Sequence, residues 1–337
     1  MSELQRASVG AVVTSIAVAL LVSALQAGQT TAPGAQANKT AATRTSTPPR
    51  MADGRPELQG VWSFATATPL QRPQEFAGKP VLTDAEAAAF EKKLATGGCR
   101  IINCDGSARA TLETAYNDFW WDWGNKLALN RTSLIVDPPD GRMPPTTPEG
   151  QKRVTAGFAA FVRPTNGPED RTLADRCLIG FNAGPPLTPS AYNNNVQVFQ
   201  AHDHVALLTE MSHNARIVPL DGRPHLSRTV LQWAGDSRGH WEGDTLVIET
   251  TNFRADTAPG GGSPAVARLV ERLTRVDRDV LMYEYTMSDP AIWTKPWTVQ
   301  VPMMRSREPI YEYACHEGNY AMPNILSAAR ADDRKSK

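Results

Sequence analysis

The sequence predicts a mainly β protein whose strands form an antiparallel meander that closes into a barrel, with a few short helices in the N-terminal half. Three observations support this fold class. After Tyr192 the chain repeatedly alternates apolar and polar residues over short segments. Tight turns join these segments, and no helical pattern separates them. Closing such a sheet removes its unpaired edges, which favours a barrel over a sandwich.

The individual elements follow from local patterns. Leu281, Tyr283 and Tyr285 share one face of a strand by the two-residue period. Thr83 and Glu86 form a capping box that begins a short helix reaching Leu94, and a second helix runs from Pro148 to about Phe161. The expected strands are Leu58–Phe64, Thr132–Asp137, Val196–Gln200, Val205–Met211, Ala215–Leu220, Gly239–Glu242, Thr245–Thr250, Leu269–Val276, Val280–Met287, Trp297–Met304 and Ile310–Ala314.

The chain ends differ in composition from this region. An apolar run from Val9 to Ala27 predicts a signal peptide over residues 1–28, and its modest length favours cleavage over retention as a membrane anchor. Residues 29–54 predict a disordered linker, residues 55–328 a single β-rich domain, and residues 329–337 a disordered tail. We therefore expect an exported protein, periplasmic or extracellular, without a stable membrane span after cleavage.

Four cysteines lie in the exported part: Cys99, Cys104, Cys177 and Cys315. An even number in an oxidising compartment predicts disulfides, and four cysteines allow three pairings. A short staple between Cys99 and Cys104 would leave Cys177 to pair with Cys315. Zinc binding is the competing interpretation, but no second closely spaced Cys or His accompanies either pair of cysteines.

Several function classes lose support. The formal net charge is zero and no basic stripe is present, so we expect no nucleic-acid partner. The fingerprints of serine hydrolases, kinases, zincins and dinucleotide-binding proteins are missing from the sequence, and we expect no cofactor. His202 and His204 have a spacing that suits a metal, but they fall in a predicted hairpin turn, so a solvated loop is favoured and no metal is predicted.

Four longer motifs carry a resemblance. They are Gly235–Phe253, which begins GDSRGHWEGDTLV, together with Arg216–His225, Asp289–Trp297 and Tyr311–Tyr320, which reads YEYACHEGNY. The sequence resembles a family of exported bacterial proteins to which no activity is attached, and the resemblance covers most of the chain after Leu58. The triplet Gly60-Val61-Trp62 also resembles the opening of lipocalin-type barrels, which implies a calycin-like barrel.

Polar residues near the strand ends supply candidate sites. A carboxylate beside an imidazole can orient it for proton transfer, so Glu210 with His213 and Glu317 with His316 are the predicted catalytic pairs. The alternatives are a polar cluster that satisfies loop backbone and a tail packed on the barrel. The predicted substrate-binding residues, which combine aromatic walls with amide and guanidinium groups, are Trp120, Trp121, Tyr192, Asn194 and Arg216.

Two functions are compatible with these features. The first is a cofactor-independent acid–base enzyme, a lyase, isomerase or hydrolase, that acts on a small and partly apolar molecule inside the barrel. The second is a lipocalin-like carrier that binds an apolar small molecule without chemistry. The sequence places the enzyme slightly ahead of the carrier, because a pure carrier has little use for so many polar residues at positions expected to be buried. It does not predict the oligomeric state.

Overall fold

The computed structural model describes residues 47–97, 122–162, 165–255, 257–258, 262–263 and 265–335. The chain divides into residues 1–44 and 45–337, and the described residues all belong to the second unit. The predicted signal peptide, residues 29–46 of the predicted linker, Cys99, Cys104, Trp120 and Trp121 lie outside the described residues.

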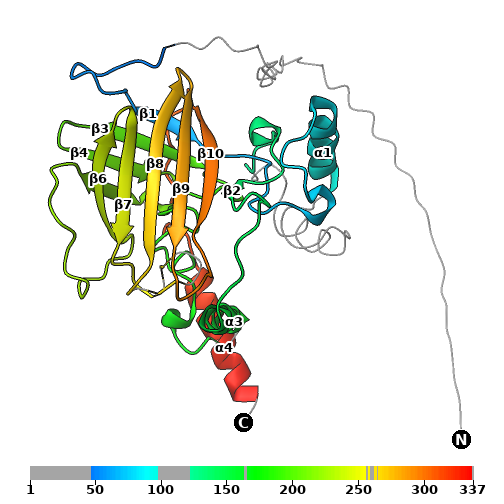
Figure 1. Cartoon of the computed structure of the whole chain (residues 1–337). Coiled ribbons are helices and arrows are strands. Elements are labelled where there is room, and N and C mark those ends of the chain that lie inside the picture. Colours follow the sequence, from blue (N-terminus) through cyan, green and yellow to red (C-terminus); the bar gives the residue numbers. More distant parts are fainter. Residues whose placement is uncertain are drawn as a thin grey trace, which may run out of the picture. The chain divides into compact units, whose positions relative to one another are not determined.

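The strands form a nearly closed antiparallel barrel, which confirms the predicted fold class (Figure 1). Strand β1 pairs with both β3 and β10, and every other neighbour in the wall is consecutive, from β3 to β5 and from β6 to β10. Short β2 pairs with β10 beside this path. The strands are β1 Gly60–Ser63, β2 Ile135–Asp137, β3 Asn195–Gln200, β4 His204–Thr209, β5 Ala215–Pro219, β6 Asp236–Glu242, β7 Thr245–Thr251, β8 Arg268–Asp277, β9 Val280–Ser288 and β10 Trp297–Arg305.

The wall closes between β5 and β6 by side-chain packing, because no ladder of hydrogen bonds joins these two strands among the described residues. Gly239 of β6 makes this approach possible. A Cβ atom at that position would lie 2.6 Å from Cδ2 of Leu220 and 2.9 Å from Cγ1 of Val218. A larger residue would therefore have to displace the side chains of Leu220 and Val218.

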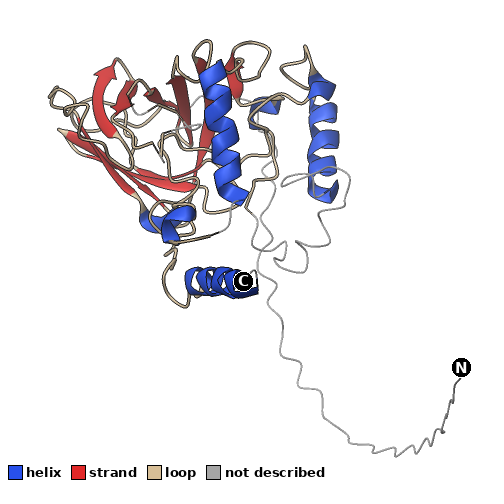
Figure 2. Cartoon of the chain, turned by 90° about the horizontal axis from the view of Figure 1, so that it is seen from below, coloured by secondary structure: helices blue, strands red, loops and turns tan. Residues whose placement is uncertain are grey.

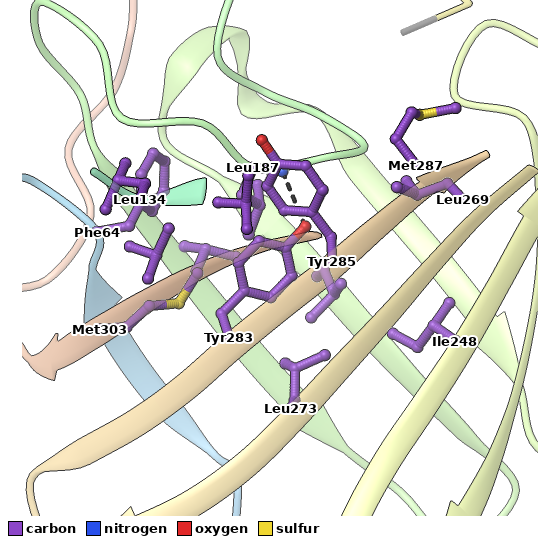
Figure 3. Packing of buried hydrophobic residues seen from close by; sticks show 14 of the residues in the cluster. Phe64, Leu134, Leu187, Ile248, Leu269, Leu273, Tyr283, Tyr285, Met287 and Met303 are labelled. Atoms are coloured by element: carbon purple, nitrogen blue, oxygen red, sulfur yellow. Dashed lines mark hydrogen bonds between the residues drawn. The ribbon is translucent and has the colours of Figure 1, made fainter. Parts of the chain in front are cut away.

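Alternating residues of each strand fill the barrel interior. The predicted shared face of Leu281, Tyr283 and Tyr285 is confirmed, since all three side chains are almost completely buried. Figure 3 shows the two tyrosines between Met303 and Met287 inside the wall. Much of the interior is thus a packed core rather than a hollow.

Trp62 of β1 packs in the core near the C-terminal end of β8. Its indole N–H donates to the Leu58 carbonyl oxygen at 2.9 Å, and the guanidinium of Arg275 lies 5.2 Å from the ring centroid. Arg275 is buried and donates to the carbonyl oxygens of Glu57 and Arg278. Burial and the neighbouring charge of Arg305 lower its pKa.

Helices lie outside the curved sheet (Figure 2). The predicted first helix is confirmed as α1, Asp84–Gly97, and its capping box joins the Thr83 amide to Glu86 Oε2 at 3.0 Å. The predicted second helix is confirmed as α3, Pro148–Val162. The short 3-10 helices are η1 Gln74–Phe76, η3 Ala128–Asn130, η4 Pro168–Asp170 and η5 Met211–His213.

The structure differs from the predicted boundaries at both ends of the domain. Helix α4 spans Ala321–Lys335, so residues 329–335 are helical instead of a disordered tail, and one helix lies outside the N-terminal half. Arg330 anchors α4 by donating to the carbonyl oxygens of Thr165 and Asn166. Within residues 47–54, predicted as linker, Arg50 forms an exposed ion pair with Asp244.

No helix in the described residues is long and apolar enough to cross a membrane.

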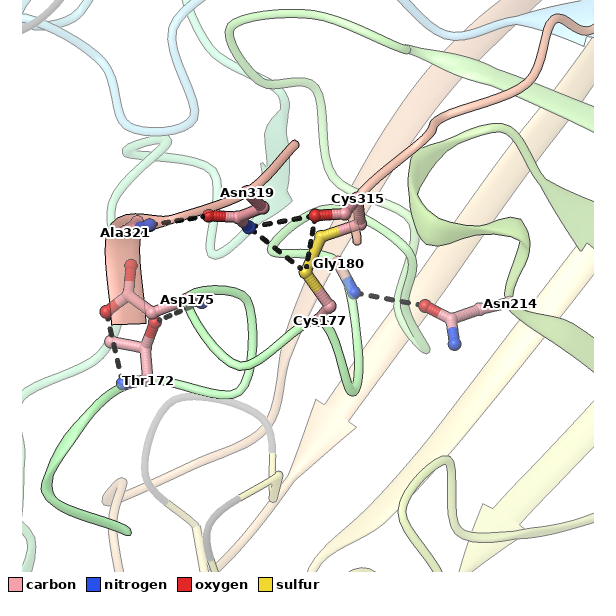
Figure 4. Close-up of a disulfide and its surroundings, with 8 residues drawn as sticks. All are labelled: Thr172, Asp175, Cys177, Gly180, Asn214, Cys315, Asn319 and Ala321. Atoms are coloured by element: carbon pink, nitrogen blue, oxygen red, sulfur yellow. Dashed lines mark hydrogen bonds between the residues drawn. A yellow bond between two sulfur atoms is a disulfide. The ribbon is translucent and has the colours of Figure 1, made fainter. Parts of the chain in front are cut away.

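A disulfide joins Cys177 to Cys315, with the two Cα atoms 5.8 Å apart (Figure 4). This is one of the predicted bridges, and it connects residues 138 positions apart in the sequence. The bridge ties the segment between η4 and β3 to the segment between β10 and α4. It therefore restricts the unfolded chain over a long loop.

We expect the double substitution Cys177→Ser/Cys315→Ser to lower the free energy of unfolding by about 2 to 5 kcal/mol, because the unfolded state regains the freedom of that loop. Urea denaturation of the oxidised proteins measures this loss. Cys99→Ser/Cys104→Ser is the matched control and should lose less, since a bridge there would close only a few residues. Equal losses for both variants would contradict the expectation.

Candidate functional site

A hollow of about 410 Å³ lies at the end of the barrel where β4 ends and β5 begins. Its volume falls within the usual range for small-molecule sites. Two loops, 178–187 and 231–234, form the walls that the strands do not supply. The lining residues of the strands and their junction are Leu207, Thr209, Asn214, Ala215 and Arg216.

Most of the lining residues are apolar. Leu178, Leu187, Leu207 and Leu231 line the hollow together with the indole of Trp233, which the Arg254 guanidinium covers at 4.1 Å. These groups can remove a ring or short chain from water.

The polar side chains that line the hollow belong to Thr209, Asn214, Arg216 and Gln232. The Thr209 hydroxyl is 3.2 Å from the Asn214 carbonyl oxygen, so it serves the turn between β4 and β5. Asn214 Oδ1 accepts the Gly180 amide at 3.0 Å, and Figure 4 shows Nδ2 on the side away from Gly180. Arg216 is the one charged residue among the lining residues of the described chain.

Arg216 points into the barrel because it shares a face of β5 with buried Val218. There it forms a bidentate ion pair with Glu271, in which Nη2 lies 2.8 Å from Oε1 and Nη1 bonds Oε2. The Glu271 side chain is completely buried, and 10% of the Arg216 side chain is exposed. Arg216 therefore lines the hollow, and Glu271 lies buried behind it.

Tyr283 completes the network. Its hydroxyl donates to Glu271 Oε1 at 2.7 Å and accepts the Leu187 amide at 3.0 Å (Figure 3). Burial, followed by the negative charge of Glu271, raises the pKa of Tyr283 well above its usual value. Burial alone would lower the pKa of Arg216, but the charge and hydrogen bonds of Glu271 raise it. The network therefore combines the neutral phenol of Tyr283, the cationic guanidinium of Arg216 and the side-chain oxygens of Glu271, which accept hydrogen bonds from both.

Loop 178–187 is fixed at several points. A Cβ atom on Gly180 would lie 2.0 Å from Met211 Cγ, so only glycine lets the loop lie this close to η5. Asn182 donates to the Tyr192 carbonyl oxygen at 3.0 Å. The Leu187 amide is bound by Tyr283, and the disulfide holds Cys177 just before the loop. The wall of the hollow is thus preorganised.

No family model and no curated protein matches the sequence, and no solved structure matches the fold.

Glu210 and His213, predicted to act together, both contact the segment 311–313. Glu210 is buried; its Oε2 accepts from Asn195 Nδ2 at 2.5 Å and its Oε1 accepts the Tyr311 amide at 3.3 Å. His213 Nε2 lies 3.3 Å from the Tyr313 amide nitrogen and 3.2 Å from the Tyr311 carbonyl oxygen, and its tautomer decides which it bonds. The two side chains hold this segment against the barrel.

These contacts also explain why the predicted strand Ile310–Ala314 is wrong. The structure has no strand at these residues. Amides and carbonyls that would pair with a neighbouring strand instead meet the side chains of Glu210 and His213. Alternation of apolar residues cannot distinguish these two ways of satisfying the backbone.

His316 and Glu317 are exposed, and no hydrogen bond or ion pair joins them to Glu210 or His213 in the described chain. His316 lines a second hollow of about 320 Å³ beside the disulfide, together with Arg176, Asn319 and Met322. The structure therefore does not bring the four predicted catalytic residues into one site.

The predicted substrate-binding residues also separate. Asn194 is buried, and its side chain bonds the Asp122 carbonyl oxygen at 2.6 Å and both backbone groups of Ser190. Tyr192 packs edge-on against Phe181 with ring centroids 5.4 Å apart. Arg216 is the predicted site residue that lines the larger hollow.

Sequence reasoning missed Glu271 and Tyr283 as site residues. A signal for Glu271 was present, because it lies between Leu269 and Leu273 on the face that the two-residue period sends inward. An inward carboxylate needs a buried partner.

Among the described residues, no group of three His, Cys, Asp or Glu side chains is arranged to hold a metal ion.

Breaking the buried pair should be costly. We expect Arg216→Met and Glu271→Gln each to lower the free energy of unfolding by about 3 to 5 kcal/mol, because each leaves one buried charge without its counter-charge. The double variant should lose less than the sum of the single losses. Urea denaturation of all four proteins completes this cycle, and additive losses would show that the two groups do not interact.

The role of Glu210 can be tested in the same way. Glu210→Gln leaves a single oxygen for two donors, so we expect a loss of about 1 to 3 kcal/mol and faster tryptic cleavage at Arg307, which precedes the held segment. Exposed Glu317→Gln is the matched control. Unchanged cleavage kinetics in Glu210→Gln would contradict the assigned role.

Proposed function

We propose that this domain binds a small, partly apolar molecule at the open end of its barrel, as an exported binding protein. The observation that carries the proposal is the 410 Å³ hollow, whose leucine and tryptophan walls meet a polar corner at Arg216 and Asn214. Apolar walls with a few placed polar groups are typical of ligand sites. The disulfide supports function in an oxidising compartment.

The geometry favours binding over the acid–base chemistry expected at the predicted residues. Glu210 uses both carboxylate oxygens, and His213 uses Nε2, to hold neighbouring chain. His316 lines a different hollow, beside the disulfide. A proton-transfer group must reach the reacting atom, and these side chains already have structural partners or lie elsewhere.

The size of the hollow sets the scale of affinity. Burying roughly 200 Å² of apolar ligand surface at about 25 cal/mol per Å² contributes about 5 kcal/mol. Part of this gain is offset by the loss of translational and rotational freedom, and well-placed hydrogen bonds add to it. We therefore expect dissociation constants in the micromolar range or weaker for an unoptimised probe.

The test uses the neutral fluorescent probe N-phenyl-1-naphthylamine. We expect its fluorescence to rise on saturable binding to the purified full-length protein, because the hollow removes its rings from water. Ala234→Trp fills the lining and should weaken binding at least about tenfold. Ala201→Trp, in the exposed turn before β4, is the matched control and should bind like the unchanged protein. Equal binding by both variants would refute this location.

A further inference from the structure

The charge of the hollow bears on which ligands it accepts. Its lining contains one cationic side chain, Arg216, and no Asp, Glu, Lys or His among the described residues. Arg216 by itself would suggest a site for an anion such as a carboxylate.

The charge of Arg216 is, however, already neutralised. Both Nη atoms bond the two oxygens of Glu271, and the Glu271 side chain is completely buried behind them. Tyr283 donates a further hydrogen bond to the same carboxylate, and the Leu187 amide fixes the phenol (Figure 3). Every partner of Glu271 in this network is a donor, so both of its oxygens act as acceptors.

A bound anion would find no unpaired cation in this corner. It would lose hydration and lie near the Glu271 carboxylate, with only the outer side of an already paired guanidinium in return. If Arg216 turned toward the ligand instead, Glu271 would remain buried without its counter-charge. Both arrangements are unfavourable compared with leaving the pair intact.

A neutral acceptor avoids both costs. A carbonyl oxygen can accept from the outer N–H groups of Arg216 or from Asn214 Nδ2 without disturbing the ion pair. The apolar walls can then bury the rest of the molecule.

We propose that the hollow selects uncharged molecules with an apolar body and a carbonyl-type hydrogen-bond acceptor, and discriminates against carboxylates of the same shape. This inference rests on the proposed binding function and adds the ligand class. The paired state of Arg216 determines the selectivity, so Glu271 acts as a specificity residue without lining the hollow.

The experiment compares two probes of nearly equal shape, 1-naphthaleneacetamide and 1-naphthaleneacetate, by isothermal titration calorimetry at pH 8. We expect the amide to bind at least about tenfold more tightly than the carboxylate. Equal or tighter binding of the carboxylate would overturn the inference while leaving the binding function intact. If N-phenyl-1-naphthylamine binds and the amide does not, the acceptor requirement is wrong. If none of the three probes binds, the proposed function itself fails.

A charge-removing variant tests the cause. Glu271→Gln keeps the shape of the side chain and frees the charge of Arg216, so we expect the preference to shift toward the carboxylate by at least about tenfold. Glu284→Gln is the matched control, because Glu284 lies on β9, alternates with the inward tyrosines and bonds Gln300 Nε2 at 2.6 Å. If folded Glu271→Gln keeps the wild-type preference for the amide over the carboxylate, Glu271 is not a specificity residue. If that variant does not fold, the comparison of the two probes on the wild-type protein still decides whether the hollow discriminates against carboxylates.

Discussion

Pairing of β1 with both β3 and β10 is the constraint on which the rest of the structure depends. This four-residue strand joins the meander β3–β5 to the meander β6–β10 and so bends the sheet around a common interior. Without it, the inward faces of the two meanders would have no shared core. The close approach at Gly239 then completes the wall by side-chain packing.

Once the wall is closed, inward positions on β5, β8 and β9 face one another. Arg216, Glu271 and Tyr283 come from three strands and meet in the barrel, where burial requires each of them to have a partner. Because the three side chains bond one another, the ion pair can lie at the base of a hollow whose lining residues are mostly apolar. The same network reaches loop 178–187 through the Leu187 amide.

The short segment after β4 has a comparable role outside the barrel. Glu210 and His213 hold residues 311–313, while Met211 and Asn214 hold the loop at Gly180. The two segments that carry Cys177 and Cys315 are therefore docked on the same short stretch of chain. This shared support explains how cysteines far apart in the sequence come into bonding distance.

The sequence by itself determined most of the strands, their turns, the capped helix and the meander, because each depends on spacing between near neighbours. It also indicated Arg216, but it could not show that Glu271 neutralises that charge, since 55 residues separate the pair and only barrel closure makes them face each other. The same limit applies to Glu210 and His213, which looked like a proton-transfer pair by proximity. Only the tertiary structure revealed their partners, because hydrogen-bond partners across a fold depend on which strands and loops are brought together.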